Sequence, residues 1–150
     1  MKKLREGGML VAMVHQTSGR IFAKKLKEHG IIEINPAQGR ILFVLWEKDG
    51  ITIRELSEKT MLEKSTLTSM LDRLEEAGYI TRMPSAEDRR AILIWRTEKD
   101  KALQKTYEEV SEDMTRLYYS GFSSPEIDRL EAGLRKVLDN LVAYETKTKR

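Results

Sequence analysis

The sequence predicts a mainly α-helical fold with one small β-hairpin, and three observations lead to that prediction. Apolar residues recur at spacings of three and four over most of the 150 positions, which is the period of amphipathic helices. Two short runs rich in aromatic and β-branched residues flank a turn-forming segment, as in a hairpin. Capping residues and glycines stand where the helical patterns begin and end. A chain of this length is the usual size of one folded unit.

The first helix is expected over about residues 9–29, where Gly30 can end it. Residues four and seven apart fall on one face of this helix, namely Val11, His15, Phe22 and Leu26. His15 on this apolar stripe is interpreted as a packed or interfacial histidine, with a place beside an effector as the alternative.

The second helix is predicted to open with Asn35 as its cap, Pro36 at the first helical position and Gln38 at the third. Its buried face consists of Ile41, Leu42, Val44 and Leu45, and Asp49-Gly50 stops it. Trp46 lies beside that face, where core packing is favoured over lining an effector pocket.

Two shorter helices are expected next. Thr52 and Glu55 have the spacing of a capping box, which predicts a helix near residues 53–60. After a turn, a further helix is expected from about Glu63 to just before Gly78. It has a buried stripe at spacings of three and four, made of Leu67, Met70, Leu71 and Leu74.

The opposite face of the helix that starts near Glu63 carries short hydrogen-bonding side chains and one long cation, namely Ser65, Thr66, Thr68, Ser69, Asp72 and Arg73. Ser and Thr form helices less well than Lys and Glu, so four hydroxyl residues work against helix propensity. They allow close approach to phosphates and base edges and can donate to either. The face therefore fits a DNA major groove, with an ordinary solvated surface as the alternative.

The hairpin is expected from strands over residues 79–83 and 91–97, joined by a turn that starts at Pro84. Arg89 and Arg90 lie at its tip, where two guanidinium groups can reach phosphates or enter a minor groove. Asp88 is expected to orient one of them. Two short helices, a hydroxyl-rich helix and a basic hairpin, in this order, make a winged helix-turn-helix.

Two long helices are predicted after the hairpin. The first spans about residues 98–120, with a seam at spacings of three and four, and the chain turns at Gly121. Ser123 and Glu126 form a capping box for the last helix. Its apolar stripe includes Ile127, Leu130, Leu134, Val137 and Leu141, and Leu138 and Val142 widen it. Packing against a second chain explains so wide a stripe, so a homodimer is expected.

Composition excludes several functional classes. The chain has no cysteine, which rules out disulfides and thiol chemistry and favours a cytoplasmic location. No apolar run approaches the roughly 20 residues that span a bilayer. Two distant histidines, scattered carboxylates and no phosphate-binding glycine loop indicate neither an enzyme nor a metal or cofactor site. The net charge of +3 is weak support for DNA binding, because acidic and basic residues balance over residues 51–97.

With these features in place, the sequence resembles the MarR (multiple antibiotic resistance regulator) family of winged-helix transcription regulators. The matching segments follow the order of that family's recognition helix, strand entry and wing, namely Leu71-Asp72-Arg73-Leu74-Glu75, Gly78-Tyr79-Ile80, Pro84 and Asp88-Arg89-Arg90. One departure is Arg96-Thr97, where the family has Leu-Thr. By strand alternation Arg96 shares a face with Ile92 and Ile94, so either its head reaches solvent or the strand ends earlier than in relatives.

The resemblance implies a sequence-specific regulator of double-stranded DNA, expected to be a repressor. It implies dimerisation helices at residues 1–30 and 98–150 around a winged region at about 31–97. It further implies a homodimer on a palindromic operator, released by a small-molecule effector of phenolic type. The alternative is a winged-helix protein-interaction module that has lost DNA binding, but such a module has no use for Arg89 and Arg90 at an exposed tip.

Overall fold

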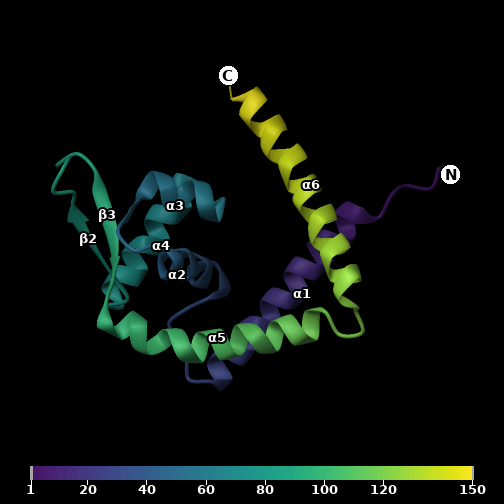
Figure 1. Ribbon diagram of the computed structural model, residues 1–150, viewed down its shortest axis with the longest axis horizontal. Coiled ribbons are helices and arrows are strands. Elements are labelled where there is room, and N and C mark those ends of the chain that lie inside the picture. Colours follow the sequence, from purple (N-terminus) through teal and green to yellow (C-terminus); the bar gives the residue numbers. More distant parts are fainter. Residues whose placement is uncertain (1, 150) are drawn as a thin grey trace. The chain divides into compact units, whose positions relative to one another are not determined.

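The computed structural model describes residues 2–149 and contains helices together with a small antiparallel sheet (Figure 1). Within these residues the elements, in chain order, are α1 (Gly7–Glu28), α2 (Pro36–Glu47), β1 (Ile51–Thr52), α3 (Ile53–Thr60), α4 (Lys64–Glu76), β2 (Ile80–Pro84), β3 (Ile92–Arg96), α5 (Glu98–Tyr118) and α6 (Ser124–Thr148). The predicted class, mainly helical with a β-hairpin, is confirmed. Every helix in the described range is too short or too polar to cross a bilayer.

The chain divides into two compact units. The first runs up to Glu112 and contains α1 to β3 with the first part of α5. The second starts at Asp113 and contains the end of α5 and all of α6. The winged region therefore shares a unit with α1 and the start of α5.

Local capping chemistry sets where the helices begin. Asn35 accepts a hydrogen bond from the Gln38 amide at 2.8 Å, and the Gln38 side chain accepts one from the Asn35 amide at 2.9 Å. The predicted box of Ser123 and Glu126 likewise forms in full at the start of α6. The box at α3 forms only in half, because Thr52 caps the Glu55 amide but the Glu55 carboxylate accepts from Lys48 at 2.9 Å. The prediction of a full box at α3 was wrong.

Gly78 sets the direction in which the chain leaves α4. Its φ of +89° lies in the left-handed region, which favours glycine. The Tyr79 amide donates to the Leu74 carbonyl at 2.9 Å and the Gly78 amide to the Glu75 carbonyl at 3.0 Å. These two bonds end the helix as a Schellman motif, and β2 starts two residues later beside α4.

The sheet has three strands in the order β1-β3-β2, all antiparallel. Strand β2 begins and ends one residue later than predicted, and β3 is one residue shorter than predicted at each end. Ile80 pairs with Arg96 in the observed register. The sequence did not predict β1, because Thr52 had been assigned only as a helix cap. Pairing of Thr52 with Leu93 ties the start of α3 to the hairpin.

The core of the first unit lies between α2, α3, α4 and the sheet, with contributions from α1 and α5. Leu67, Leu71 and Leu74 of the predicted stripe are fully buried, and each Leu contributes about 1.5–3 kcal/mol of stabilisation. In α1 only Leu26 is buried, whereas Val11 is exposed. Val11 and His15 of the predicted α1 stripe are exposed in the single chain, whereas Phe22 and Leu26 pack into the core.

An aromatic cluster joins α1, α2 and α5. The Tyr107 ring lies 5.5 Å from the Phe22 ring and 5.3 Å from the Trp46 ring, in edge-to-face geometry. Gly39 makes this possible, because a Cβ at that position would lie 1.7 Å from Tyr107 Oη. Burial raises the pKa of Tyr107 to about 12, so its hydroxyl stays protonated at neutral pH.

Candidate nucleic-acid interface

The recognition face of α4, defined as Ser65, Thr66, Thr68, Ser69 and Arg73, lies opposite the buried leucines of that helix. Four of these side chains are exposed, and Thr68 is half-buried. The Thr68 hydroxyl donates to the Lys64 carbonyl at 2.8 Å, which occupies its proton within the helix. Over residues 2–149 no hydrogen bond or ion pair engages the side chains of the other four. Three hydroxyls and one guanidinium are therefore available to a ligand.

The wing tip, residues 85–91, is a closed loop held by its own backbone. The Ser85 amide donates to the Ala91 carbonyl at 2.9 Å, and the Ala91 amide donates to the Asp88 carbonyl at 3.0 Å. The Asp88 carboxylate accepts from the Arg90 backbone amide at 3.0 Å. Asp88 thus fixes the backbone at Arg90, whereas it was predicted to orient the side chain of one of the two arginines. Arg89 and Arg90 are exposed, and their side chains have no protein partner within the described range.

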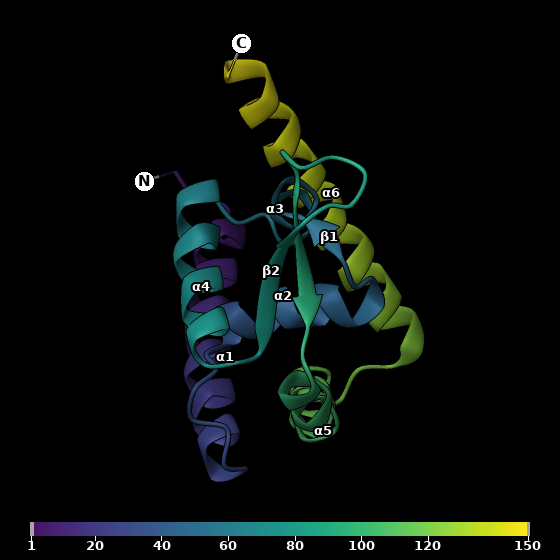
Figure 2. The same ribbon diagram turned by 90° about the vertical axis from the view of Figure 1, so that its left-hand side faces the viewer.

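Helix α4 and the hairpin lie side by side, with β2 next to the helix (Figure 2). The recognition face and the wing tip therefore belong to one unit and to neighbouring elements. Arg82 of β2 joins the two elements through Asp72 and Glu75, a contact that was not predicted from the sequence.

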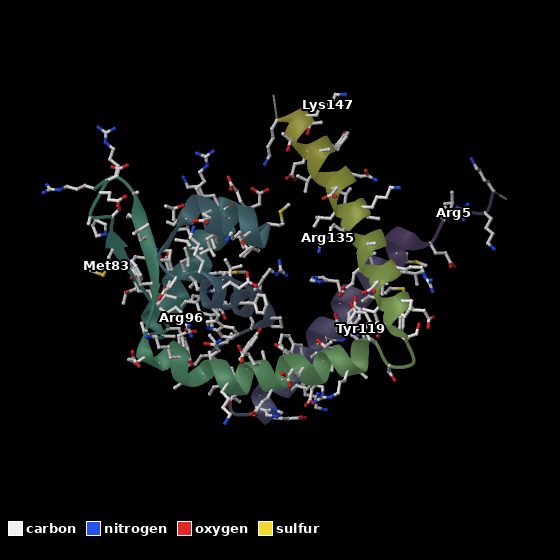
Figure 3. The ribbon with its side chains drawn as sticks, in the orientation of Figure 1. Arg5, Met83, Arg96, Tyr119, Arg135 and Lys147 are labelled. Atoms are coloured by element: carbon white, nitrogen blue, oxygen red, sulfur yellow. The ribbon has the colours of Figure 1, made fainter. Side chains whose placement is uncertain are left out.

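Arg96 lies where β3 runs into α5 (Figure 3), and its head does not reach solvent, which was one of the two predicted outcomes. The strand continues to Arg96, and the Arg96 side chain is only 13% exposed. Its Nε donates to Asp100 Oδ2 at 2.6 Å and its guanidinium to Gln104 Oε1 at 2.5 Å. Asp100 is fully buried and also accepts from Trp46 Nε1 at 3.0 Å. Arg96, which stands where the family has leucine, is therefore paired with the buried Asp100 carboxylate.

The two residues suggested for an effector pocket lie on different helices. Trp46 on α2 is half-buried, packs between Phe43 and Tyr107, and donates its indole N–H to Asp100. These contacts favour the packing interpretation of Trp46. His15 is exposed on α1, and neither a hydrogen bond nor a ring contact joins it to Trp46 in the described part of the chain.

In the second unit, α6 has no buried residue. On its predicted stripe, Leu134, Val137 and Leu141 are exposed, whereas Ile127 and Leu130 are half-buried. The Tyr119 hydroxyl donates to Glu131 at 2.8 Å and connects α6 to the end of α5 (Figure 3 labels Tyr119). That hydrogen bond raises the pKa of Tyr119.

A helix with free hydroxyls and a guanidinium, next to a hairpin with two exposed arginines, defines a winged helix-turn-helix DNA-binding protein. The profile of the MarR family matches residues 34–92, which span α2 to the start of β3. The organic hydroperoxide resistance transcriptional regulator of Bacillus subtilis is 37% identical over 110 residues, covering 73% of this chain and 74% of that protein. The multiple antibiotic resistance protein MarR of Escherichia coli is 30% identical over 132 residues, covering 87% and 90%.

A crystal structure of a mutant of Escherichia coli MarR in complex with operator DNA superposes with a TM-score of 0.79 and 28% identity, over 91% of this chain and 99% of that one. The chain belongs to the MarR family. It is a DNA-binding transcription regulator and not an enzyme, and the resemblance noted from the sequence is confirmed.

Proposed function

We propose that this chain represses transcription as a homodimer bound to a palindromic duplex operator and that a small-molecule effector releases it. The observation that carries the proposal is a recognition face whose side chains, apart from Thr68, make no hydrogen bond within residues 2–149, beside a closed wing tip where Arg89 and Arg90 have no protein partner in the same range. In this arrangement α4 lies in a major groove and the wing tip reaches the adjacent minor groove.

The side chains of the recognition face are expected to make different contacts with DNA. Ser65, Thr66 and Ser69 offer hydroxyls to phosphates or base edges, and Arg73 offers a planar fork that matches a guanine edge. Thr68 presents its methyl group and an acceptor, because its proton is bonded to Lys64. Arg89 and Arg90 supply charge to the backbone and to a narrow minor groove.

The homodimer part of the proposal is supported by the exposed apolar surface of α6. Leu134, Val137 and Leu141 form a stripe that the single chain leaves in solvent. Burying such a stripe in a second chain removes apolar area from water and relates two recognition helices by a two-fold axis. A palindromic operator follows from that symmetry.

Binding selection tests the proposal. Duplexes selected from a random pool should show two-fold symmetry, with half-sites about 34–36 Å apart. The logarithm of affinity should fall with the logarithm of salt by about 0.9 per phosphate contact neutralised. Selected sites without symmetry would contradict the homodimer, and a flat salt response would favour a protein-interaction module.

The effector part has its own test, in which Trp46 emission reports on the environment of α2. A Trp95→Phe variant leaves Trp46 as the remaining tryptophan, since the chain has two. Small phenolic acids that displace the selected duplex should also change Trp46 emission if the effector binds near Trp46 or His15. Displacement without an emission change would place the effector elsewhere, and no displacement by any member of the series would remove the effector from the proposal.

A further inference from the structure

Arg82 on β2 makes four hydrogen bonds to α4. One guanidinium nitrogen, Nη2, lies 2.6 Å from Asp72 Oδ1 and 2.9 Å from Glu75 Oε1. The Nε atom donates to Glu75 Oε1 at 3.3 Å, and the Arg82 backbone amide donates to Glu75 Oε2 at 3.1 Å. The Arg82 clasp, defined as Arg82, Asp72 and Glu75, therefore fixes both the side chain and the main chain of β2 to the helix.

The clasp compensates a charge arrangement that is unfavourable for α4 by itself. The helix has no acidic residue in its first turn, whereas Asp72, Glu75 and Glu76 occupy its last two turns. Carboxylates near a helix C-terminus oppose the helix dipole. The hydrogen bond from Arg82 lowers the pKa of Glu75, and the hydrogen bonds that Arg82 donates to Glu75 and Asp72 raise the pKa of Arg82, so both shifts favour the charged forms.

The clasp borders the recognition face, because Asp72 precedes Arg73 and its side chain is 61% exposed. A bare carboxylate there would repel the phosphates that the recognition face approaches. The Arg82 side chain is 23% exposed and is already engaged by two carboxylates. It therefore differs from Arg73, Arg89 and Arg90, which have no such partners among the described residues.

We propose that Arg82 is a positioning residue for DNA binding, which holds α4 and the hairpin at a fixed angle and neutralises Asp72 and Glu75 without contributing a phosphate contact. The inference rests on the proposed placement of α4 and the wing tip in adjacent grooves. It adds Arg82 as a residue that affects DNA affinity through Asp72 and Glu75.

Salt-dependent binding separates a positioning residue from a phosphate contact. Arg82→Gln should lower affinity for the selected duplex by about tenfold, the magnitude expected when hydrogen bonds to charged groups are lost. The slope of log affinity against log salt should stay at the wild-type value. The comparison variant Arg90→Gln should instead reduce that slope by about 0.9, because it removes one phosphate contact. Arg116→Gln, in the second unit, removes an exposed arginine paired with Asp113 and should change neither quantity.

A double-mutant cycle tests whether Arg82 acts through Asp72. In the Arg82→Gln background, Asp72→Asn should recover several-fold in affinity, because it removes the carboxylate left without its cation. In the wild-type background the same substitution should change affinity by less than about twofold, since Arg82 already neutralises Asp72. Equal effects in the two backgrounds would overturn the proposal, as would a salt slope reduced by Arg82→Gln.

Amide hydrogen exchange separates failure of this proposal from failure of the proposed function. Arg82→Gln should speed exchange at the residue 82 amide whether or not the protein binds DNA, because the Glu75 carboxylate loses its second partner. Faster exchange with unchanged affinity would overturn the positioning role alone.

If Arg82→Gln does not fold, Arg82→Lys provides the test of the positioning role, because lysine keeps the charge and lacks the planar guanidinium fork. If Arg82→Lys bound DNA with wild-type affinity, Arg82 would act only by neutralising Asp72 and Glu75. That result would overturn the proposal that it holds α4 and the hairpin at a fixed angle.

Discussion

Gly39 determines how closely α5 packs on α2. Tyr107 is 4% exposed and lies between the rings of Phe22 and Trp46, so its ring cannot swing away from a new methyl group. We expect Gly39→Ala to lower the free energy of unfolding by about 1–3 kcal/mol through overpacking, although Ala is the better helix former. Urea denaturation followed by circular dichroism measures the change.

Gly133 in α6 is the matched control, since a Cβ there would have no atom within 4 Å. Gly133→Ala should raise the free energy of unfolding by roughly 0.5–1 kcal/mol, the helix-propensity difference. If both substitutions raised stability, Tyr107 would not be packed against Gly39 as described.

Arg96 is the residue where this sequence departs from the family pattern, and its partner Asp100 is fully buried. Arg96→Leu restores the apolar residue but leaves a buried carboxylate without its cation. We predict a loss of about 3 kcal/mol in unfolding free energy. Adding Asp100→Asn should recover part of that loss, because the side chain is then neutral. An Arg96→Leu protein as stable as wild type in chemical denaturation would show that Asp100 does not need Arg96.

At the scale of elements, α4 and the hairpin are expected to contribute differently to binding. Arg73→Ala should cost about 1–3 kcal/mol of binding free energy at one position of the selected site if Arg73 contacts a guanine edge. Arg90→Ala should weaken binding to every duplex, with the larger loss where the minor groove is narrow and A·T-rich. Fluorescence anisotropy with single-base variants of the duplex measures both. A uniform loss for Arg73→Ala would make it a phosphate contact.

Elements defined by local chemistry could be predicted from the sequence. The bounds of α3 agree with the prediction, and α2 and α6 start at their predicted caps. The recognition face also follows from helical periodicity, because three buried leucines fix which side of α4 faces outward. Hydrogen bonds between near neighbours in the sequence are sufficient for these features.

Features that depend on distant partners could not be predicted. Strand β1 exists because Ile51 pairs with Ile94, and nothing in its two residues indicates a strand. The Trp46–Asp100 bond joins residues 54 positions apart, and the same carboxylate accepts from Arg96. The Arg82 clasp depends on the angle at which β2 leaves Gly78, and the spacing of apolar residues in the sequence does not determine that angle.

For the whole molecule, the dimer proposal depends on the α6 stripe. Leu134 and Leu141 lie seven residues apart and are exposed in the single chain. Replacing both with Arg would place unpaired charge in the proposed interface, so sedimentation should find a monomer that has lost operator binding. The control Asp128→Arg with Asp139→Arg adds positive charge to the polar side of α6 and should leave the dimer intact. A Leu134→Arg, Leu141→Arg protein that remained a dimer with normal affinity would show that the interface lies elsewhere.

In the proposed complex, two copies of α4 read one duplex in adjacent turns of the major groove. A hydroxyl-radical footprint of the protein on its selected duplex distinguishes this arrangement from binding by a single copy. We predict two symmetric protected regions about 10 to 10.5 base pairs apart from centre to centre, which disappear together in the Leu134→Arg, Leu141→Arg protein. A single protected region that the double variant retained with unchanged affinity would contradict this arrangement.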